Sequence, residues 1–263
     1  MTAPGAFDWR SAPFGPGVTV LSAHAGGLAA LAKPAGILAH PNTAADRARA
    51  LFDAEYDEPG ECFRWAGEGG APARRVWLLH RLDSATSGVV LVATREETAA
   101  AVRDAFAQRK VQKKYTAIVL GHPRERRALW RDAMEVKRGA AAGTGRGVRA
   151  DASAGSRGMA AETDMRVLRL IPGPPALAAI ELEPHTGRTH QLRHQCARRH
   201  LPILGDQNYG NFRLNRELAR KLGTDRLFLH ARFVALEIVV GDTRINFTAE
   251  APLPPEFSRF ASR

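Results

Sequence analysis

Short apolar runs rich in branched residues alternate with turn-forming residues along most of the chain. Residues 18–40 are typical of two short strands joined at Gly26-Gly27, and the runs at 76–79 and 88–93 predict buried strands on either side of a polar loop. Further strands are expected at 113–120, 163–170 and 177–183, with a closing hairpin over 228–249. The pattern therefore predicts a fold in which strands dominate.

Helical patterns are few. Thr94 with Glu97 three residues later is typical of a capping box, and Ala99, Val102 and Phe106 follow at helical spacing, which predicts a helix over 95–109. A basic stretch from 188 to 200 predicts a second helix. Because strands and helices do not alternate regularly, we expect an α+β fold with a mixed, largely antiparallel sheet and few flanking helices.

The domain organisation follows from the composition of three segments. Residues 1–17 are expected to be a flexible leader, and residues 18–263 a single domain. Residues at about 138–161 are nearly all Gly, Ala, Arg or Ser and have no periodicity, so we expect a flexible insertion there.

The composition and the net charge of the chain limit its possible classes of function. Of the 263 residues 44% are hydrophobic, which excludes wholesale disorder, and a net charge of +11 favours a polyanionic partner, nucleic acid first. The alternative is an arginine-rich composition with no such partner. Two cysteines imply no disulfide framework, and neither a signal peptide nor an apolar run of about 18 residues is present. We therefore expect a cytoplasmic protein that binds no membrane.

The first segment with candidate chemistry is His80-Arg81-Leu82-Asp83, followed by Thr86-Ser87-Gly88. It places a carboxylate in a polar loop between two predicted strands, and loops held by a sheet often carry catalytic groups. Asp83 is therefore either a catalytic carboxylate or the first residue of an Asx turn.

The second segment is basic. From Pro184 to Leu204 there are four arginines, four histidines and no acidic residue, which suits contact with phosphate or pairing with a carboxylate elsewhere. A solvated helix face is the alternative. Tyr115, next to two lysines, is able to stack on a base or to pack in the core. Cys196 and His200 lack a second pair of ligands, so no metal site is predicted.

Five segments in this order resemble the RluA family of RNA pseudouridine synthases, over about residues 18–252. They are Lys33-Pro34-Ala35-Gly36, the segment from His80 to Gly88, Lys114-Tyr115-Thr116-Ala117, Thr186-Gly187-Arg188-Thr189-His190-Gln191-Leu192-Arg193, and Pro202-Ile203-Leu204-Gly205-Asp206 with Tyr209-Gly210. The chain departs from the usual Val-His-Met after Arg193, where it has His194-Gln195-Cys196.

The resemblance implies an enzyme that isomerises a uridine of transfer RNA or large-subunit ribosomal RNA at a central catalytic cleft, without a cofactor. It implies that Asp83 acts on the nucleoside, that Arg193 pairs with Asp83, that Tyr115 stacks on the uracil and that Arg81 replaces the flipped base. The further residues expected to bind RNA are His80, Arg188, Lys114 and Lys33. We expect a monomer that needs no protein partner. The alternative is an inactive RNA-binding protein that keeps the fold.

Overall fold

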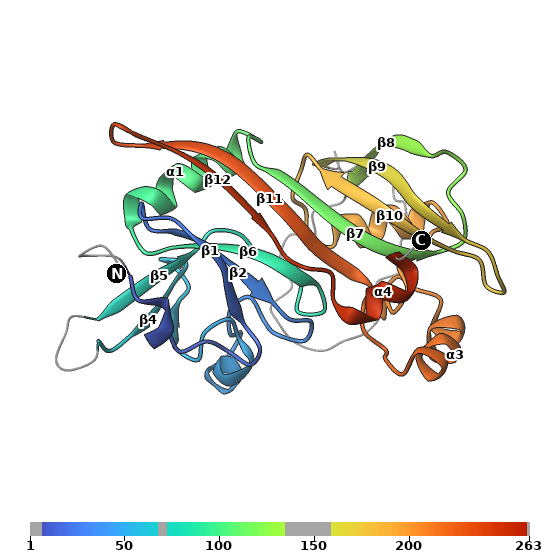
Figure 1. The fold of residues 1–263 in the computed structure, drawn as a ribbon, viewed down its shortest axis with the longest axis horizontal. Helices are drawn as coiled ribbons and strands as arrows, with labels where there is room; N and C mark the ends of the chain where they lie inside the picture. The colour runs from blue at the N-terminus through green and yellow to red at the C-terminus, as the bar shows by residue number, and fades with distance from the viewer. Residues whose placement is uncertain (1–6, 68–72, 135–158, 262–263) are drawn as a thin grey trace. The chain divides into compact units, whose positions relative to one another are not determined.

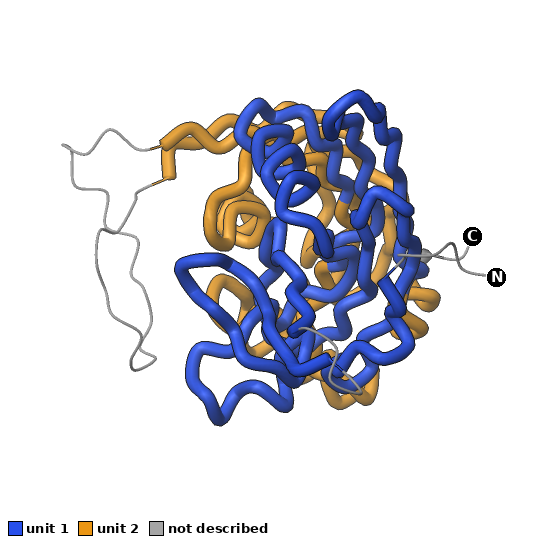
Figure 2. The backbone as a smooth tube through the Cα atoms, turned by 90° about the vertical axis from the view of Figure 1, so that its left-hand side faces the viewer, with its two compact units in different colours: residues 1–114, 230–253 blue, residues 115–229, 254–263 orange. Residues whose placement is uncertain are grey.

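The computed structural model describes residues 7–67, 73–134 and 159–261, which belong to two compact units (Figure 2). Unit 1 comprises Met1–Lys114 and His230–Leu253, and unit 2 comprises Tyr115–Leu229 and Pro254–Arg263. The chain therefore passes from one unit to the other three times.

Unit 1 is built on a mixed sheet in which β6 is the central strand. β6 pairs antiparallel with β2 and β5, and parallel with β11 at His230 and Ala231. β4 joins β5 and β3 joins β4, whereas β1 pairs with β2 and β12 with β11. The strands are β1 (Thr19–Ala23), β2 (Leu28–Lys33), β3 (Glu55–Asp57), β4 (Cys62–Trp65), β5 (Arg74–Leu78), β6 (Ser87–Ala93), β11 (Leu229–Val240) and β12 (Thr243–Glu250).

The core of unit 1 forms where helix α1 (Glu96–Ala107) packs near β6. Every residue of β6 is buried, as the apolar run over 88–93 predicts, and α1 buries Ala99 and Val102 in the same cluster. Leu236 and Phe247 of the long β11–β12 hairpin complete this cluster. Full burial of each large apolar side chain stabilises the fold by roughly 1.5–3 kcal/mol, so the core holds both ends of the loop between β5 and β6.

The amino-terminal residues that the structure describes are packed against unit 1. Phe14 stacks on Phe52 at 5.2 Å, and the Gly15 amide donates a hydrogen bond to the Leu51 carbonyl. A short 3-10 helix, η1 (Trp9–Ser11), precedes this contact, and a second, η2 (Ala44–Arg49), follows β2. Residues 7–17 of the expected leader are therefore packed in the structure, because their aromatic side chains have apolar partners.

Unit 2 is an antiparallel sheet with the strand order β7-β10-β9-β8. Its strands are β7 (Gln112–Leu120, which begins in unit 1), β8 (Arg127–Met134), β9 (Met159–Ile171) and β10 (Leu177–Pro184). Its helices are α2 (Gln191–Arg198), α3 (Phe212–Leu222) and α4 (Pro255–Ala261) (Figure 1). Among the described residues, no helix is long and apolar enough to cross a membrane.

The predicted fold class and the predicted strands are confirmed, but details differ. The N-cap of α1 is Arg95, because the Thr94 hydroxyl instead donates to the carbonyl of Gly27. The helix α2 begins at Gln191, after His190 in the left-handed conformation. Three residues of the expected insertion, 159–161, begin β9, and residues 138–158 lie outside the described residues.

Gly88 is the glycine on which the sheet of unit 1 depends most. It has φ +120° at the point where β6 pairs with β11, and a Cβ atom there would collide with the backbone of Ala231. Gly36 also has a positive φ, of +89°, but no atom lies near its missing side chain. A substitution at Gly36 would therefore cause backbone strain alone, whereas a substitution at Gly88 would add a steric clash.

We predict that Gly88→Ala lowers the free energy of unfolding by about 3 kcal/mol, because strain and clash combine. Gly36→Ala should cost only about 1 kcal/mol, from strain alone. Urea denaturation of both variants measures the difference. Equal losses would contradict the assigned clash with Ala231.

Candidate active site

Asp83 lies on the loop between β5 and β6, at the edge of the unit 1 core. Leu82 beside it is buried, whereas the Asp83 side chain is half-buried and Arg81 is exposed. The Thr86 amide donates a hydrogen bond of 3.0 Å to the Asp83 carbonyl and closes a turn. The loop thus anchors its apolar residue and leaves the carboxylate partly open to solvent.

Lys33 holds this loop from inside. Its side chain is 1% exposed, and its ammonium donates hydrogen bonds to the carbonyls of Pro34, Ile37 and Ser84 at 3.0, 2.6 and 2.9 Å. The Gly36 amide donates to the same Ser84 carbonyl at 2.8 Å. Lys33 was expected to bind RNA, but its ammonium is buried and engaged by carbonyls. It therefore positions the residue next to Asp83.

His80 fixes the other end of the loop. The Leu91 amide donates a hydrogen bond of 3.0 Å to His80 Nε2, so this nitrogen carries no proton. Burial, together with the positive charge of Lys113, lowers the pKa of His80 to about 3. The imidazole is therefore neutral and joins the loop to β6. The predicted contact between His80 and RNA stays a prediction.

Arg81 lies at the surface beside two aromatic rings. Its guanidinium donates to His40 Nε2 at 3.1 Å, and the His40 ring stacks on Tyr56 with 4.8 Å between centroids. Burial, followed by the charge of Glu61, raises the pKa of Tyr56 to about 12, against the opposing effect of Arg81. The guanidinium is thus oriented by a ring yet remains exposed, as a group that enters RNA must be.

A buried serine–histidine pair secures the start of β6. Ser87 Oγ lies 2.8 Å from His230 Nδ1, and His230 Nε2 lies 3.3 Å from the Ala251 carbonyl. Since a carbonyl only accepts, the ring proton is assigned to Nε2, and the serine hydroxyl donates to Nδ1. The sequence around His230 does not reveal this role, because its partner Ser87 is 143 residues away.

In unit 2, the predicted residue Arg193 forms a buried ion pair with Asp206. Its Nε donates to Oδ2 at 2.8 Å and its Nη2 to Oδ1 at 2.9 Å, so the pairing is bidentate. Burial by itself raises the pKa of Asp206, but hydrogen bonds from Arg193 and from the amides of Tyr209 and Asn208 outweigh it, and the net pKa is lowered. Asp206 is therefore ionised, and it was missed as a site residue.

Aromatic rings surround this ion pair. The Arg193 guanidinium lies 5.4 Å from the centre of the Tyr209 ring, and His190 and His194 meet the same ring edge-on. His190 Nδ1 is also 3.2 Å from the Tyr209 hydroxyl. Two histidines of the basic stretch thus hold Tyr209 over Arg193.

A buried polar network shapes the loop that carries Arg188. Gln191 Oε1 accepts hydrogen bonds from the Thr186 hydroxyl at 2.8 Å and from the Arg188 amide at 3.1 Å. Its amide nitrogen donates to the Glu162 carbonyl and to Thr163 Oγ1, both at 3.1 Å. Within the described part of the chain, the buried Nε of Arg188 has no hydrogen-bond partner. The predicted contact between Arg188 and RNA stays a prediction.

The residues around Tyr115 lie on β7. Tyr115 is half-buried and opposite Leu182 of β10. Lys113 lies 5.7 Å from the Phe106 ring centre and has a pKa lowered by burial, whereas Lys114 lies 5.9 Å from the Phe233 ring centre. Both lysines thus contact rings of unit 1, while Tyr115 belongs to unit 2.

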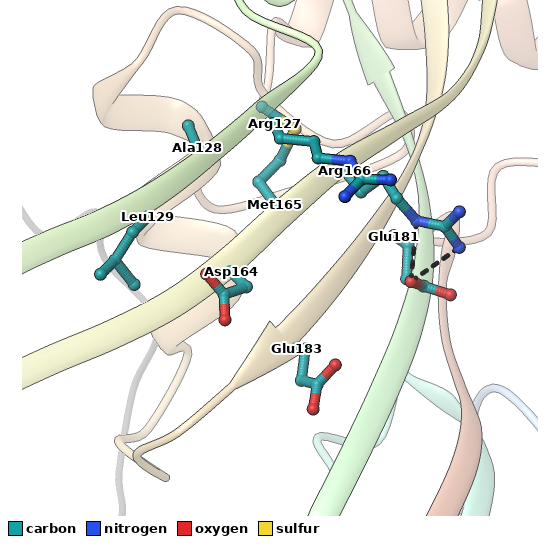
Figure 3. Close-up of a pocket in the computed structure, with 8 residues that line it drawn as sticks. All are labelled: Arg127, Ala128, Leu129, Asp164, Met165, Arg166, Glu181 and Glu183. Carbon is teal, nitrogen blue, oxygen red and sulfur yellow. Dashed lines mark hydrogen bonds and ion pairs between the residues drawn. The ribbon is translucent and has the colours of Figure 1, made fainter.

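Unit 2 contains a pocket that is lined by residues of β8, β9 and β10 (Figure 3). Its lining includes three carboxylates, Asp164, Glu181 and Glu183, and two arginines, of which Arg166 is paired with Glu181 at 3.0 Å. None of the residues predicted to bind RNA lines this pocket, and we do not assign the active site to it.

Comparison with known proteins identifies the class. Residues 27–198 match the family of RNA pseudouridylate synthases. The chain is 32% identical to tRNA pseudouridine synthase C of Haemophilus ducreyi, over 79% of this chain and 80% of that protein. It is also 32% identical to ribosomal large subunit pseudouridine synthase C of Rickettsia bellii, over 69% of this chain and 55% of that protein.

The solved structure of human RNA pseudouridylate synthase domain containing 4 matches with a TM-score of 0.64 and 26% identity, over 92% of each chain. The chain belongs to the RNA pseudouridylate synthase family, and the resemblance inferred from its motifs is confirmed.

We predict a specific pH dependence of stability from His80. Because its folded pKa lies below the usual 6.5, its contribution is complete above pH 6.5 and is lost as the pH falls toward 3. At pH 5 the loss should reach up to about 2 kcal/mol. Urea unfolding of His80→Gln should lack this loss, because glutamine keeps an acceptor but does not titrate.

The exposed His200 provides the control. The variant His200→Asn should unfold with the same pH dependence as the unmodified protein. If His80→Gln also keeps that dependence, the imidazole is not held neutral in the folded protein.

Proposed function

We propose that this chain converts one uridine of transfer RNA to pseudouridine, with Asp83 as the catalytic group. The observation that carries the proposal is the placement of Asp83 in the family's sequence block, on a loop that Lys33 and His80 hold from inside. The carboxylate is half-buried, so it is reachable by a nucleoside. The loop is rigid enough to aim it.

One carboxylate is sufficient for this reaction. The bond between the sugar C1′ and uracil N1 breaks, the uracil turns, and a bond from C1′ to C5 forms. C5 then loses its proton and N1 gains one, so that the product is an isomer of the substrate. Nothing is hydrolysed, so the second carboxylate of a glycosidase is not required. Exclusion of water protects the detached uracil until it rebonds.

The resemblance supplies the roles of Tyr115 and Arg193. Tyr115 would stack on the uracil, and Arg193 would pair with Asp83. Because Asp83 belongs to unit 1 and the other two residues to unit 2, both roles remain predictions. The Arg193–Asp206 pair supports a positioning task, because it holds the guanidinium in one orientation.

Transfer RNA is the proposed substrate because the relative named for it aligns over more of both chains than the relative named for ribosomal RNA. The net charge of +11 suits either RNA. We place the activity in the cytoplasm, which also suits the two unpaired, buried cysteines.

Asp83→Asn should abolish turnover. With RNA labelled by tritium at uridine C5, the unmodified protein should release tritium from transfer RNA, and the variant should do so about a thousandfold more slowly or not at all. Asp242→Asn, in the exposed turn between β11 and β12, is the matched control and should retain full activity.

The outcomes separate three possibilities. Release from ribosomal RNA alone would overturn the substrate, whereas activity of Asp83→Asn would overturn the assignment of the catalytic group. No release from any RNA, together with retained RNA binding, would identify the chain as an inactive RNA-binding protein.

Arg81→Ala tests base flipping. Extraction of a base from a helix costs a few kcal/mol, and the exposed guanidinium is proposed to fill the gap. The variant should lose about tenfold in kcat/KM on a structured RNA and much less on an unstructured one. Arg75→Ala, at an exposed position of β5, removes the same charge and should affect neither. Equal losses on both RNAs would contradict this role.

A further inference from the structure

The helix α3 of unit 2 exposes one aromatic side chain and three arginines on one face. Phe212 is 57% exposed, and Arg213, Arg216 and Arg220 are also exposed. Since successive helical residues are about 100° apart, these four side chains fall within an arc of about 100°. One large aromatic ring and three guanidinium groups therefore share one side of the helix. The helix itself is at the lower right of Figure 1.

The other side of α3 holds the helix in place. Leu218 is buried, and Asn211 caps the first turn by accepting a hydrogen bond from the Leu214 amide. The last turn ends at Gly223 in the left-handed conformation. The helix thus has a fixed inner side and both ends are capped, so its exposed side chains project from a rigid support.

Asn215 links α3 to the loop that carries Asp206. Its Oδ1 accepts a hydrogen bond from the Gly205 amide at 3.1 Å, and its Nδ2 donates to the Asp206 carbonyl at 2.9 Å. The Asp206 side chain binds Arg193. Within unit 2, the exposed face of α3 is therefore fixed relative to a predicted site residue.

The basic charges of this face exceed the acidic charges near them among the described residues. Glu217 pairs with Lys221 at 2.8 Å, and the charge of Arg213 also helps to lower its pKa, but Arg213, Arg216 and Arg220 form no ion pair within that part of the chain. Three guanidinium groups beside an exposed ring match the chemistry of RNA, in which phosphates alternate with bases that stack. A protein partner would more often bury the ring and pair the charges with carboxylates.

We propose that the exposed face of α3 is an RNA-docking surface, where the arginines bind backbone phosphates and Phe212 stacks on an unpaired base. This inference rests on the proposed function and extends it, because it assigns part of RNA recognition to a helix outside the sequence blocks of the resemblance. Its task is binding, so its loss should raise KM or Kd and leave kcat nearly unchanged.

The test combines binding and turnover on one C5-tritiated tRNA transcript. The triple variant R213A/R216A/R220A should weaken binding at least tenfold and reduce the slope of log Kd against log salt by about 2 to 3, since each of three phosphate contacts contributes about 0.7 to 0.9. Replacement of the same residues by lysine should retain the slope. Phe212→Ala should weaken binding by about tenfold with little change in slope.

The matched control removes three exposed arginines from a different part of unit 2, in R124A/R126A/R127A. It makes the same change in net charge and should affect binding less than threefold. Equal losses in the two triple variants would show that only total charge matters and would overturn the proposal. So would an unchanged Kd in the α3 variants, or a Phe212→Ala variant that alters self-association but not RNA binding.

The result is separable from the proposed function. If the unmodified protein releases tritium and the α3 variants bind as it does, only the docking surface fails. If no protein releases tritium while the α3 variants lose affinity, the enzyme assignment fails and the docking surface stands. Thermal unfolding of each variant confirms that the helix is intact.

Discussion

The buried ammonium of Lys33 is the interaction on which the loop of Asp83 depends. An ammonium removed from water without partners is very costly, so its carbonyl partners must be in place when the fold forms. They come from the turn after β2 and from Ser84. The β2–β6 register places Lys33 opposite Gly88, which is why this strand pair, the turn and the loop form together. Because Lys33 fixes Ser84, the neighbouring Asp83 is held in place as well.

Unit 2 uses the same principle, with a carboxylate in place of the carbonyls. Here the buried cation is Arg193 on a helix, and its carboxylate partner Asp206 comes from a loop. The amides of Asn208 and Tyr209 complete the shell of Asp206, so the loop closes around the ion pair. In each unit a buried cation has a partner on a different segment, which fixes a predicted functional segment. Removal of one partner would leave an isolated charge, which costs more than the pair itself contributes.

Some features of the fold could be predicted from the sequence, but the partners of these buried ions could not. The strands were predictable because their apolar runs reflect burial directly, as in β6. The strand β8 was missed because only Trp130 of its eight residues is buried. The helix α3 was missed although Leu214, Leu218 and Leu222 recur at helical spacing, because its charged residues are as numerous as its apolar ones. A lysine is usually exposed, and Lys33 was predicted to bind RNA. Nothing in the neighbouring sequence reveals the carbonyls that surround its ammonium. Likewise, the partners of Ser87 and Arg193 are set by the fold and not by sequence distance.

The structure gives a role to Gln195, one of the residues after Arg193 at which the chain departs from the family pattern. Gln195 is fully buried, accepts a hydrogen bond from Thr163 and donates to Asp132, which Arg199 also contacts. This residue therefore joins α2 to the sheet and is not available to RNA. Differences in target choice then have to arise from side chains that reach the surface. Arg81 and the arginines of α3 meet that condition, whereas Lys33, Gln195 and Arg193 do not. In the proposed function, the chemistry therefore belongs to a residue that is held from within, and recognition to residues that face solvent.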